Sequence, residues 1–148
     1  MRILNGEKSM NDIEKLIKLG FEKVGHWVLD KDDPKSGLDY HLTKFHKDRV
    51  IYAFTTANEV LYVGICASKT TEFKNRLYRY KNQTGNGTNK KNTIEIKSIL
   101  KKGFKVDILA FNPNEKHHVK INGIEVDLVK GLEPGIIDYV ESKLNERK

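Results

Sequence analysis

The sequence feature that most constrains the fold is a pair of short β-type runs that each carry a tyrosine. Val50–Phe54 and Val60–Ile65 are rich in β-branched and aromatic residues, and only Thr55–Glu59 separates them. Two such runs with a short connection predict an antiparallel β-hairpin. We expect this hairpin to place Tyr52 and Tyr62 side by side at one end of a sheet.

The residues after this hairpin alternate between helical and extended patterns. Phe73 and Leu77 lie four residues apart, which predicts a helix over Thr71–Lys81 with one buried face. The polar, glycine-bearing stretch Asn82–Asn92 is typical of a loop, and a second helix is expected over Asn92–Lys102.

The C-terminal third predicts one more strand of the sheet, a turn and a last helix. Val106–Phe111 is the predicted strand, and Asn122-Gly123 indicates a type I′ turn in a short hairpin. The last helix is predicted over Glu133–Leu144, because Pro134 is tolerated in the first turn of a helix and not in its interior.

Residues 1–48 are interpreted as an N-terminal extension of a main domain at residues 49–148. Asn11 can cap a helix that ends at Gly20, and Phe21–Leu29 and Leu38–Phe45 look extended. The fold class we predict is α+β: a small three-stranded antiparallel sheet flanked by helices, with the helix and strands of the extension packed against it.

Size and composition narrow the function classes. A chain of 148 residues is expected to form one domain. No apolar run approaches the roughly 20 residues of a membrane span, and no signal-peptide pattern is present. The lone Cys66 excludes an internal disulfide and a cysteine-rich zinc site, and it favours a cytoplasmic location. The adjacent His117 and His118 would point apart, which makes them poor metal ligands.

The net charge of +7 is unevenly distributed along the chain. Residues 69–105 contain eleven Lys and Arg against two Glu, a net charge of +9, so the remaining residues sum to −2. This segregation favours a face that binds a polyanion such as nucleic acid. The alternative interpretation is an ordinary solvated helix surface rich in lysine.

Four residues of three types, Tyr52, Tyr62, Arg76 and Glu133, suit phosphodiester hydrolysis. Arg76 can hold phosphate oxygens through two parallel hydrogen bonds and keeps its charge. Glu133 offers the carboxylate oxygen that Mg²⁺ prefers. Tyr52 or Tyr62 could take a proton from water, provided that nearby cations favour the phenolate. Each residue alone has a commoner structural explanation, so the prediction depends on their combination.

The order and spacing of these residues resemble the GIY-YIG nuclease superfamily over roughly residues 50–148. That family carries two tyrosine triplets on a hairpin, an arginine in the first helix, and a glutamate and often an asparagine in the third. The matching positions here are Val50-Ile51-Tyr52, Tyr62-Val63-Gly64, Arg76, Tyr80, Glu133 and Asn145.

The resemblance implies a one-metal mechanism for cutting DNA. In it Tyr52 is the general base, Arg76 binds the scissile phosphate, and Glu133 holds Mg²⁺ or Mn²⁺. Tyr80 and Asn145 would complete the catalytic set, and Gly64 would allow close backbone approach to the site. The residues expected to contact nucleic acid are Lys69, Lys74, Arg79, Lys81, Lys90 and Lys91.

The sequence therefore predicts a metal-dependent DNA endonuclease, with two alternatives left open. One is a binding module that kept the fold and lost catalysis. The other is a regulatory RNA-binding protein, although no RNA-recognition motif is visible, which favours DNA over RNA. The chain offers little room for a separate recognition domain, so we expect either weak or short-range sequence specificity, or recognition supplied by a homodimer or a protein partner. Restriction, homing and repair roles all fit.

Overall fold

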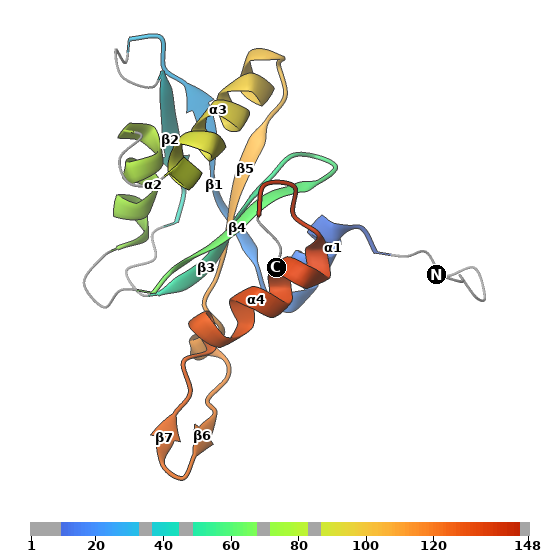
Figure 1. The fold of residues 1–148 in the computed structure, drawn as a ribbon, viewed down its shortest axis with the longest axis vertical. Helices are drawn as coiled ribbons and strands as arrows, with labels where there is room; N and C mark the ends of the chain where they lie inside the picture. The colour runs from blue at the N-terminus through green and yellow to red at the C-terminus, as the bar shows by residue number, and fades with distance from the viewer. Residues whose placement is uncertain (1–9, 33–36, 45–48, 68–71, 83–86, 146–148) are drawn as a thin grey trace, which may run out of the picture.

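The computed structural model, which describes residues 10–32, 37–44, 49–67, 72–82 and 87–145, is built around a five-stranded sheet (Figure 1). The strand order is β2-β1-β5-β3-β4, and each neighbouring pair is antiparallel. The strands are β1 (Glu22–Leu29), β2 (Leu38–Leu42), β3 (Val50–Thr55), β4 (Val60–Cys66) and β5 (Val106–Phe111).

The prediction of a three-stranded sheet was wrong because β1 and β2 of the N-terminal segment also belong to it. β1 pairs with β5 along most of its length, so that Trp27 lies opposite Val106. Local sequence pattern identified both segments as extended, but it could not show which strand they would join. Trp27 is buried, and Tyr40 packs on the same core. Phe45, the last residue of the second predicted extended segment, lies outside the described residues.

Two helices cover each face of the sheet. Helices α2 (Phe73–Asn82) and α3 (Gly87–Lys101) lie on one face, while α1 (Asp12–Leu19) and α4 (Leu128–Val140) lie on the other (Figure 1). Helix α1 confirms the expected caps: Asn11 accepts a hydrogen bond from the Glu14 backbone, and Gly20 ends the helix with a φ of 125°.

Helix α3 begins earlier than predicted. Its first residue is Gly87, so Gly87–Asn92 is helical and does not belong to the expected loop. Asn82 is the last residue of α2, and residues 83–86 of the predicted loop lie outside the described residues. The polar composition was misleading because Asn89 and Asn92 are buried on the inner side of the helix.

Helix α4 also begins and ends earlier than predicted. The side chain of Asp127 caps its N-terminus by accepting hydrogen bonds from the backbones of Val129 and Lys130. Pro134 therefore lies in the helix interior, where it cannot donate a hydrogen bond to the carbonyl of Lys130. The helix ends at Val140, and Glu141 adopts a left-handed conformation.

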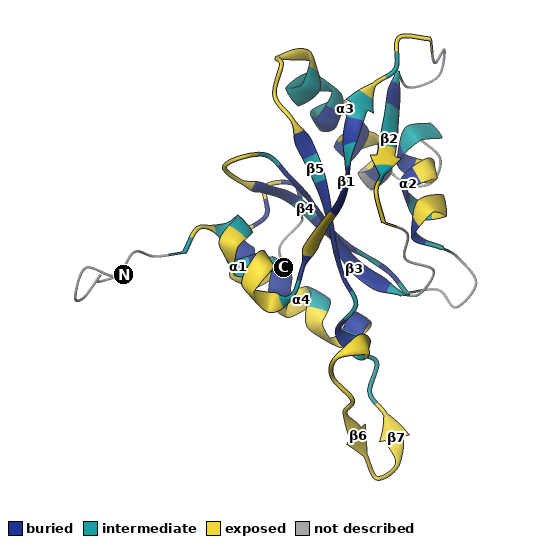
Figure 2. Ribbon diagram, turned by 180° about the vertical axis from the view of Figure 1, so that it is seen from behind, coloured by how far each residue is buried: buried dark blue, intermediate teal, exposed yellow. Residues whose placement is uncertain are grey.

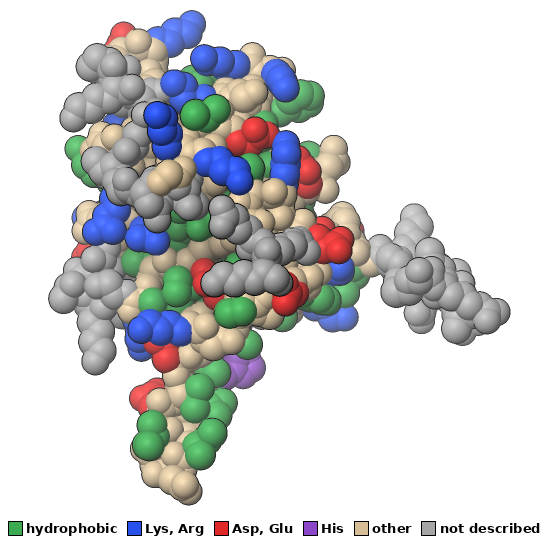
Figure 3. Space-filling model, in the orientation of Figure 1, with side chains coloured by type: hydrophobic (Ala, Val, Ile, Leu, Met, Phe, Trp, Pro, Cys, Tyr) green, Lys and Arg blue, Asp and Glu red, His purple; other side chains and the backbone are tan. Residues whose placement is uncertain are grey.

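A short hairpin projects from the body beyond the N-terminus of α4 (Figure 2). The 3₁₀ turn Pro113–Glu115 leads into β6 (Lys120–Ile121) and β7 (Ile124–Glu125). Asn122 and Gly123 both have positive φ, at 52° and 82°, which confirms the predicted type I′ turn. Apolar side chains are visible along this projection (Figure 3). None of the helices in the described part of the chain is long and apolar enough to cross a membrane.

Candidate active site

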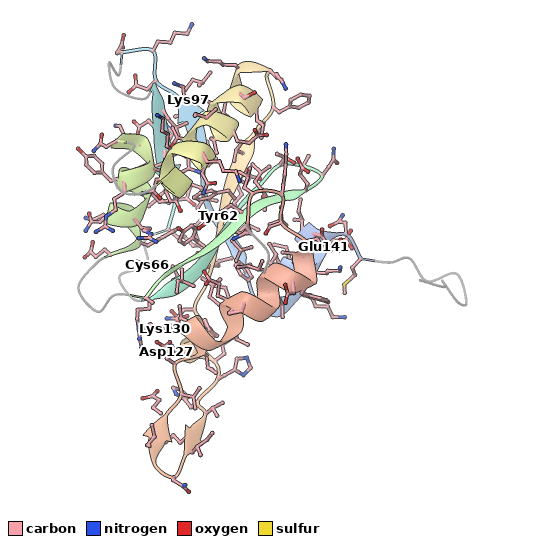
Figure 4. The ribbon with its side chains drawn as sticks, in the orientation of Figure 1. Tyr62, Cys66, Lys97, Asp127, Lys130 and Glu141 are labelled. Carbon is pink, nitrogen blue, oxygen red and sulfur yellow. The ribbon has the colours of Figure 1, made fainter. Side chains whose placement is uncertain are left out.

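A β-bulge in β4 determines on which face of the sheet Tyr62 lies. Phe54 pairs with Tyr62 and Thr55 pairs with Val60, which leaves Leu61 as an extra residue in β4. Without it, the alternation of a strand would put Val60 and Tyr62 on the same face. With it, Val60 packs beside α1 and α4, whereas Tyr62 packs on the side of α2 and α3 (Figure 4).

Tyr52 and Tyr80 form a buried pair of phenols. Their hydroxyl oxygens are 2.5 Å apart and share a hydrogen bond. Tyr52 is fully buried and Tyr80 is 1% exposed, so solvent does not reach this pair. Because Tyr80 belongs to α2 and Tyr52 to β3, the hydrogen bond fixes the helix against the sheet. Tyr62 is partly exposed, so it presents its side chain nearer to solvent.

Gly64 lies directly beneath these rings. It pairs with Tyr52 across the hairpin, and a Cβ atom added to it would lie 2.6 Å from the Tyr52 hydroxyl and 2.8 Å from Tyr62 Cε2. No side chain fits there without moving the rings. We had expected Gly64 to allow close backbone approach where a side chain would obstruct the site. In the structure the groups that approach it are the two phenols.

Arg76 lies one turn before Tyr80 on α2 and is partly buried. Its Nε atom is buried and has no hydrogen-bond partner within the described residues. The phenols of Tyr52, Tyr80 and Tyr62 act on this guanidinium: burial lowers its pKa, but the three phenols raise it by more. Arg76 therefore keeps its charge beside the tyrosines and retains a free N–H donor.

All three phenols have raised pKa values. Burial is the main cause for each, and the charges of neighbouring phenols add to it for Tyr52 and Tyr80. Hydrogen bonding and the charge of Arg76 lower the Tyr52 pKa but do not cancel the effect of burial. For Tyr62 a hydrogen bond from Tyr80 lowers the pKa, the carboxylate of Glu133 raises it, and Arg76 lowers it. Deprotonation of Tyr62 therefore depends on the charge at Glu133.

Glu133 approaches the tyrosines from α4. Burial raises the pKa of its carboxyl group, and Arg76 lowers it. Among the described residues, none hydrogen-bonds or ion-pairs with this carboxylate. The part of the chain that the structure describes also contains no group of three or more His, Cys, Asp or Glu suited to a metal ion. A single free carboxylate fits a hard divalent cation that keeps most of its water ligands, and it does not fit a zinc site built from several protein ligands.

Asn145 lies beyond the end of α4, and its carboxamide binds the backbone of β4. Its oxygen accepts a hydrogen bond from Val63 N and its nitrogen donates one to Val63 O, both at 2.8 Å. The preceding residues donate to the same strand, from Lys143 N to Val60 O and from Leu144 N to Leu61 O. The segment thus runs along the outer edge of β4 and holds the residue that follows Tyr62.

The predicted nucleic-acid contacts differ in their surroundings. Lys74 is ion-paired with Glu72 at 3.4 Å, and Lys81 with Asp39 at 3.3 Å. Lys69 lies outside the described residues. The remaining three, Arg79, Lys90 and Lys91, are exposed.

Sequence analysis missed a buried polar contact behind the site. The hydroxyl of Thr93 donates a hydrogen bond to the backbone oxygen of either Tyr80 or Asn89, both at 2.8 Å. This contact ties α3 to the end of α2. The spacing of Thr93 from the buried Ile96 could have indicated its inward position, but its place next to the predicted loop hid that signal.

Comparisons with solved structures identify the fold. A mutant of bacteriophage T4 EndoII in which alanine replaces a glutamate matches with a TM-score of 0.65 and 21% identity, over 93% of this chain and 100% of that one. The restriction endonuclease HPY188I in complex with product DNA matches with a TM-score of 0.49 and 18% identity, over 94% of this chain and 91% of that one. No family model and no curated protein matches the sequence. This chain therefore has the fold of bacteriophage T4 EndoII.

Proposed function

We propose that this protein is a DNA endonuclease that depends on a divalent metal ion. The observation that carries the proposal is the meeting of five side chains from four elements in one electrostatically coupled cluster. They are Tyr52 from β3, Tyr62 from β4, Arg76 and Tyr80 from α2, and Glu133 from α4. The shared fold with EndoII and the resemblance of the motif to GIY-YIG nucleases support the same function.

Tyr62 is the proton acceptor that we propose, in place of Tyr52. A water oxygen must form a bond to phosphorus while it loses a proton, and the bond from phosphorus to the leaving oxygen breaks. The acceptor has to reach that water. Tyr52 is fully buried and its hydroxyl is bonded to Tyr80, whereas Tyr62 is partly exposed. Tyr52 and Tyr80 then act as positioning residues that fix the arginine-bearing helix.

Arg76 is the group that we assign to the scissile phosphate. It is charged and only partly buried, and a guanidinium can bind two phosphate oxygens at once. The surrounding aromatic side chains hold it in place before the substrate arrives. Preorganised charge of this kind stabilises the charge that develops in the transition state.

Glu133 would hold the divalent cation, Mg²⁺ or Mn²⁺. When bound, the cation would neutralise charge on the phosphate and offset the carboxylate charge that raises the Tyr62 pKa. The chain's own contribution is to keep this carboxylate unpaired and partly buried near Arg76. A role for Asn145 follows from its contacts: it positions β4 beside Tyr62 and does not touch the reacting atoms.

The second candidate is a DNA- or RNA-binding module without catalysis. The burial of Tyr52 and Tyr80 favours it, since these residues would also serve as ordinary core packing. The free carboxylate of Glu133 argues against it, because a desolvated and unpaired acid next to a phosphate-binding arginine would weaken nucleic-acid binding.

A plasmid cleavage assay tests the proposal, with wild type and Glu133→Gln each assayed with Mg²⁺, Mn²⁺ and chelator. We expect nicking or linearisation by wild type with metal, none with chelator, and none by Glu133→Gln. DNA binding by Glu133→Gln should persist or strengthen, because the change removes a negative charge. Salt-sensitive binding by wild type with no cutting in any metal would favour the binding module instead.

A further inference from the structure

Helix α3 carries a straight row of lysines. At 3.6 residues per turn, positions 90, 97 and 101 fall within about 40° of one another around the helix axis, and they span about 16 Å. Lys90 and Lys101 are exposed and Lys97 is partly exposed. Ile94, which is 59% exposed, lies between them on the same stripe. We call Lys90, Lys97 and Lys101 the α3 row.

The lysines of the α3 row form no ion pairs within the part of the chain that the structure describes. The one acidic residue of α3, Glu95, is bound to Lys143 at 2.7 Å. Many lysines elsewhere do have partners, such as Lys15 with Asp12 and Lys23 with Asp107.

This arrangement costs stability in the free protein. Lys97 and Lys101 are four residues apart, a spacing at which like charges on a helix destabilise it by a few tenths of a kcal/mol. No acidic residue offsets that repulsion on this stripe in the described helix. An arrangement of this kind is favourable when a polyanion lies along the helix.

A hollow beside the α3 row is lined by one further cationic side chain, that of Lys31. It has a volume of about 340 Å³ and is lined by Lys31, Lys97 and Lys101 together with Asp30 and Gly37. Lys31 comes from the segment after β1 and Lys97 from α3, so two parts of the chain line one small depression. Three lysines against one aspartate suit a phosphate group.

We propose that the α3 row binds the phosphate backbone of duplex DNA, which would extend the contact away from the tyrosine cluster toward the far end of α3. A duplex carries about one phosphate charge per 1.7 Å of its axis, so it offers many contacts over the length of the row. The row contains no aromatic side chain, whereas proteins that bind single strands stack bases on aromatic rings. The inference rests on the proposed function.

Salt titrations of DNA binding test this inference. The parent protein is Glu133→Gln, which avoids cutting, and the probe is a labelled duplex of 20 base pairs. The row variant combines Lys90→Gln, Lys97→Gln and Lys101→Gln. The control variant combines Lys18→Gln, Lys116→Gln and Lys120→Gln, which removes the same charge from exposed lysines elsewhere. Circular dichroism checks that both variants are folded.

Each phosphate contact contributes about 0.9 to the slope of log binding constant against log salt concentration. We expect the row variant to lower the magnitude of this slope by about 2 to 3, with the control close to the parent. Equal slopes for the two variants would overturn the inference and leave the proposed function intact. Tighter binding of a single strand would overturn the assignment to duplex. No DNA binding by the parent at low salt would instead remove the proposed function.

Discussion

The two faces of the sheet are packed with different kinds of side chain. Under α2 and α3 lies a layer in which a group of aromatic side chains packs among aliphatic ones, and we call it the aromatic layer; the buried aromatic residues are Trp27, Tyr52, Phe54, Phe73 and Tyr80. Under α1 and α4 lies a mostly aliphatic layer, whose buried members are Leu16, Phe21, Ile51, Ala53, Val60, Val63, Leu109, Phe111, Val129, Ile136 and Val140.

The two layers have different roles: the aromatic layer contains side chains of the proposed active site, and the aliphatic layer supports the fold. The aromatic layer contains polar groups that are hydrogen-bonded within it, such as the hydroxyls of Tyr52 and Tyr80. The described buried members of the aliphatic layer are all apolar, and their role is to hold α4 and hence Glu133. Substitutions in the aromatic layer should therefore change the rate of cleavage, and substitutions in the aliphatic layer should change stability alone.

The largest effect in this comparison is expected for Tyr62→Phe. It removes the proposed proton acceptor, so the rate should fall roughly 100- to 10,000-fold. Tyr78→Phe is the matched control, because Tyr78 is 52% exposed on α2. Tyr52→Phe should cost less than Tyr62→Phe, since the buried hydroxyl only positions its neighbours. The measurement is single-turnover cleavage, and an equal loss in the Tyr52 and Tyr62 variants would contradict the division of roles.

Wild type and Tyr62→Phe can also be compared as a function of pH. The Tyr62 pKa is raised, so the phenolate is a minor species near neutral pH and increases about tenfold per pH unit. The cleavage rate of wild type should rise with pH through the neutral and mildly alkaline range. Tyr62→Phe should lose that rise, whereas a rise that survives in the variant would point to a different proton acceptor.

Arg76→Ala is expected to lower the rate by roughly 100- to 1,000-fold, as the loss of one preorganised donor does elsewhere. Arg79→Ala removes the same charge from an exposed position on the same helix. It should weaken DNA binding slightly and leave the rate at saturating DNA unchanged. A large drop in the melting temperature of Arg76→Ala would show that the arginine supports the fold more than the reaction.

Local features of the fold were predictable because their causes are local. Asn11 and Gly20 mark the ends of α1, and Asn122-Gly123 sets the turn of the projecting hairpin. Pairing of β1 with β5 was not predictable, because it joins segments that are distant in the sequence. The predicted start of α4 was wrong because it assumed that Pro134 must lie in the first turn. The helix tolerates one missing hydrogen bond on its exposed side.

The site residues were predictable as a set, but their arrangement was not. Residue type and order were enough to select Tyr52, Tyr62, Arg76 and Glu133, and the structure brings all four together. Residue type and spacing alone do not distinguish the two tyrosines, and the family resemblance assigned the general base to Tyr52, whereas Tyr62 is the more exposed of the two. The extra residue Leu61 in β4 makes that difference, and composition carries no signal for a bulge.

Adding one methyl group beneath the aromatic layer and another on the exposed surface of α4 sharpens the comparison. Gly64→Ala would place a Cβ 2.6 Å from the Tyr52 ring, so it should destabilise the protein by about 1–3 kcal/mol and slow cleavage by the molecules that remain folded. Gly131→Ala on α4 meets no atom within 4 Å, so it should stabilise the helix by about 0.5–1 kcal/mol. Denaturant unfolding measures both, and equal stabilities would contradict the close packing of the phenols over Gly64.

The smallest effect concerns Asn145, which belongs to neither layer and holds the edge of β4. Asn145→Ala removes two hydrogen bonds to Val63 and should cost about 1–2 kcal/mol of stability. Asn58→Ala, at an exposed turn position, is the control. If Asn145 only supports the fold, cleavage well below the melting temperature should be unchanged. Because Val63 directly follows Tyr62, we expect instead a several-fold fall in the rate at saturating DNA, with the rise of rate with pH retained.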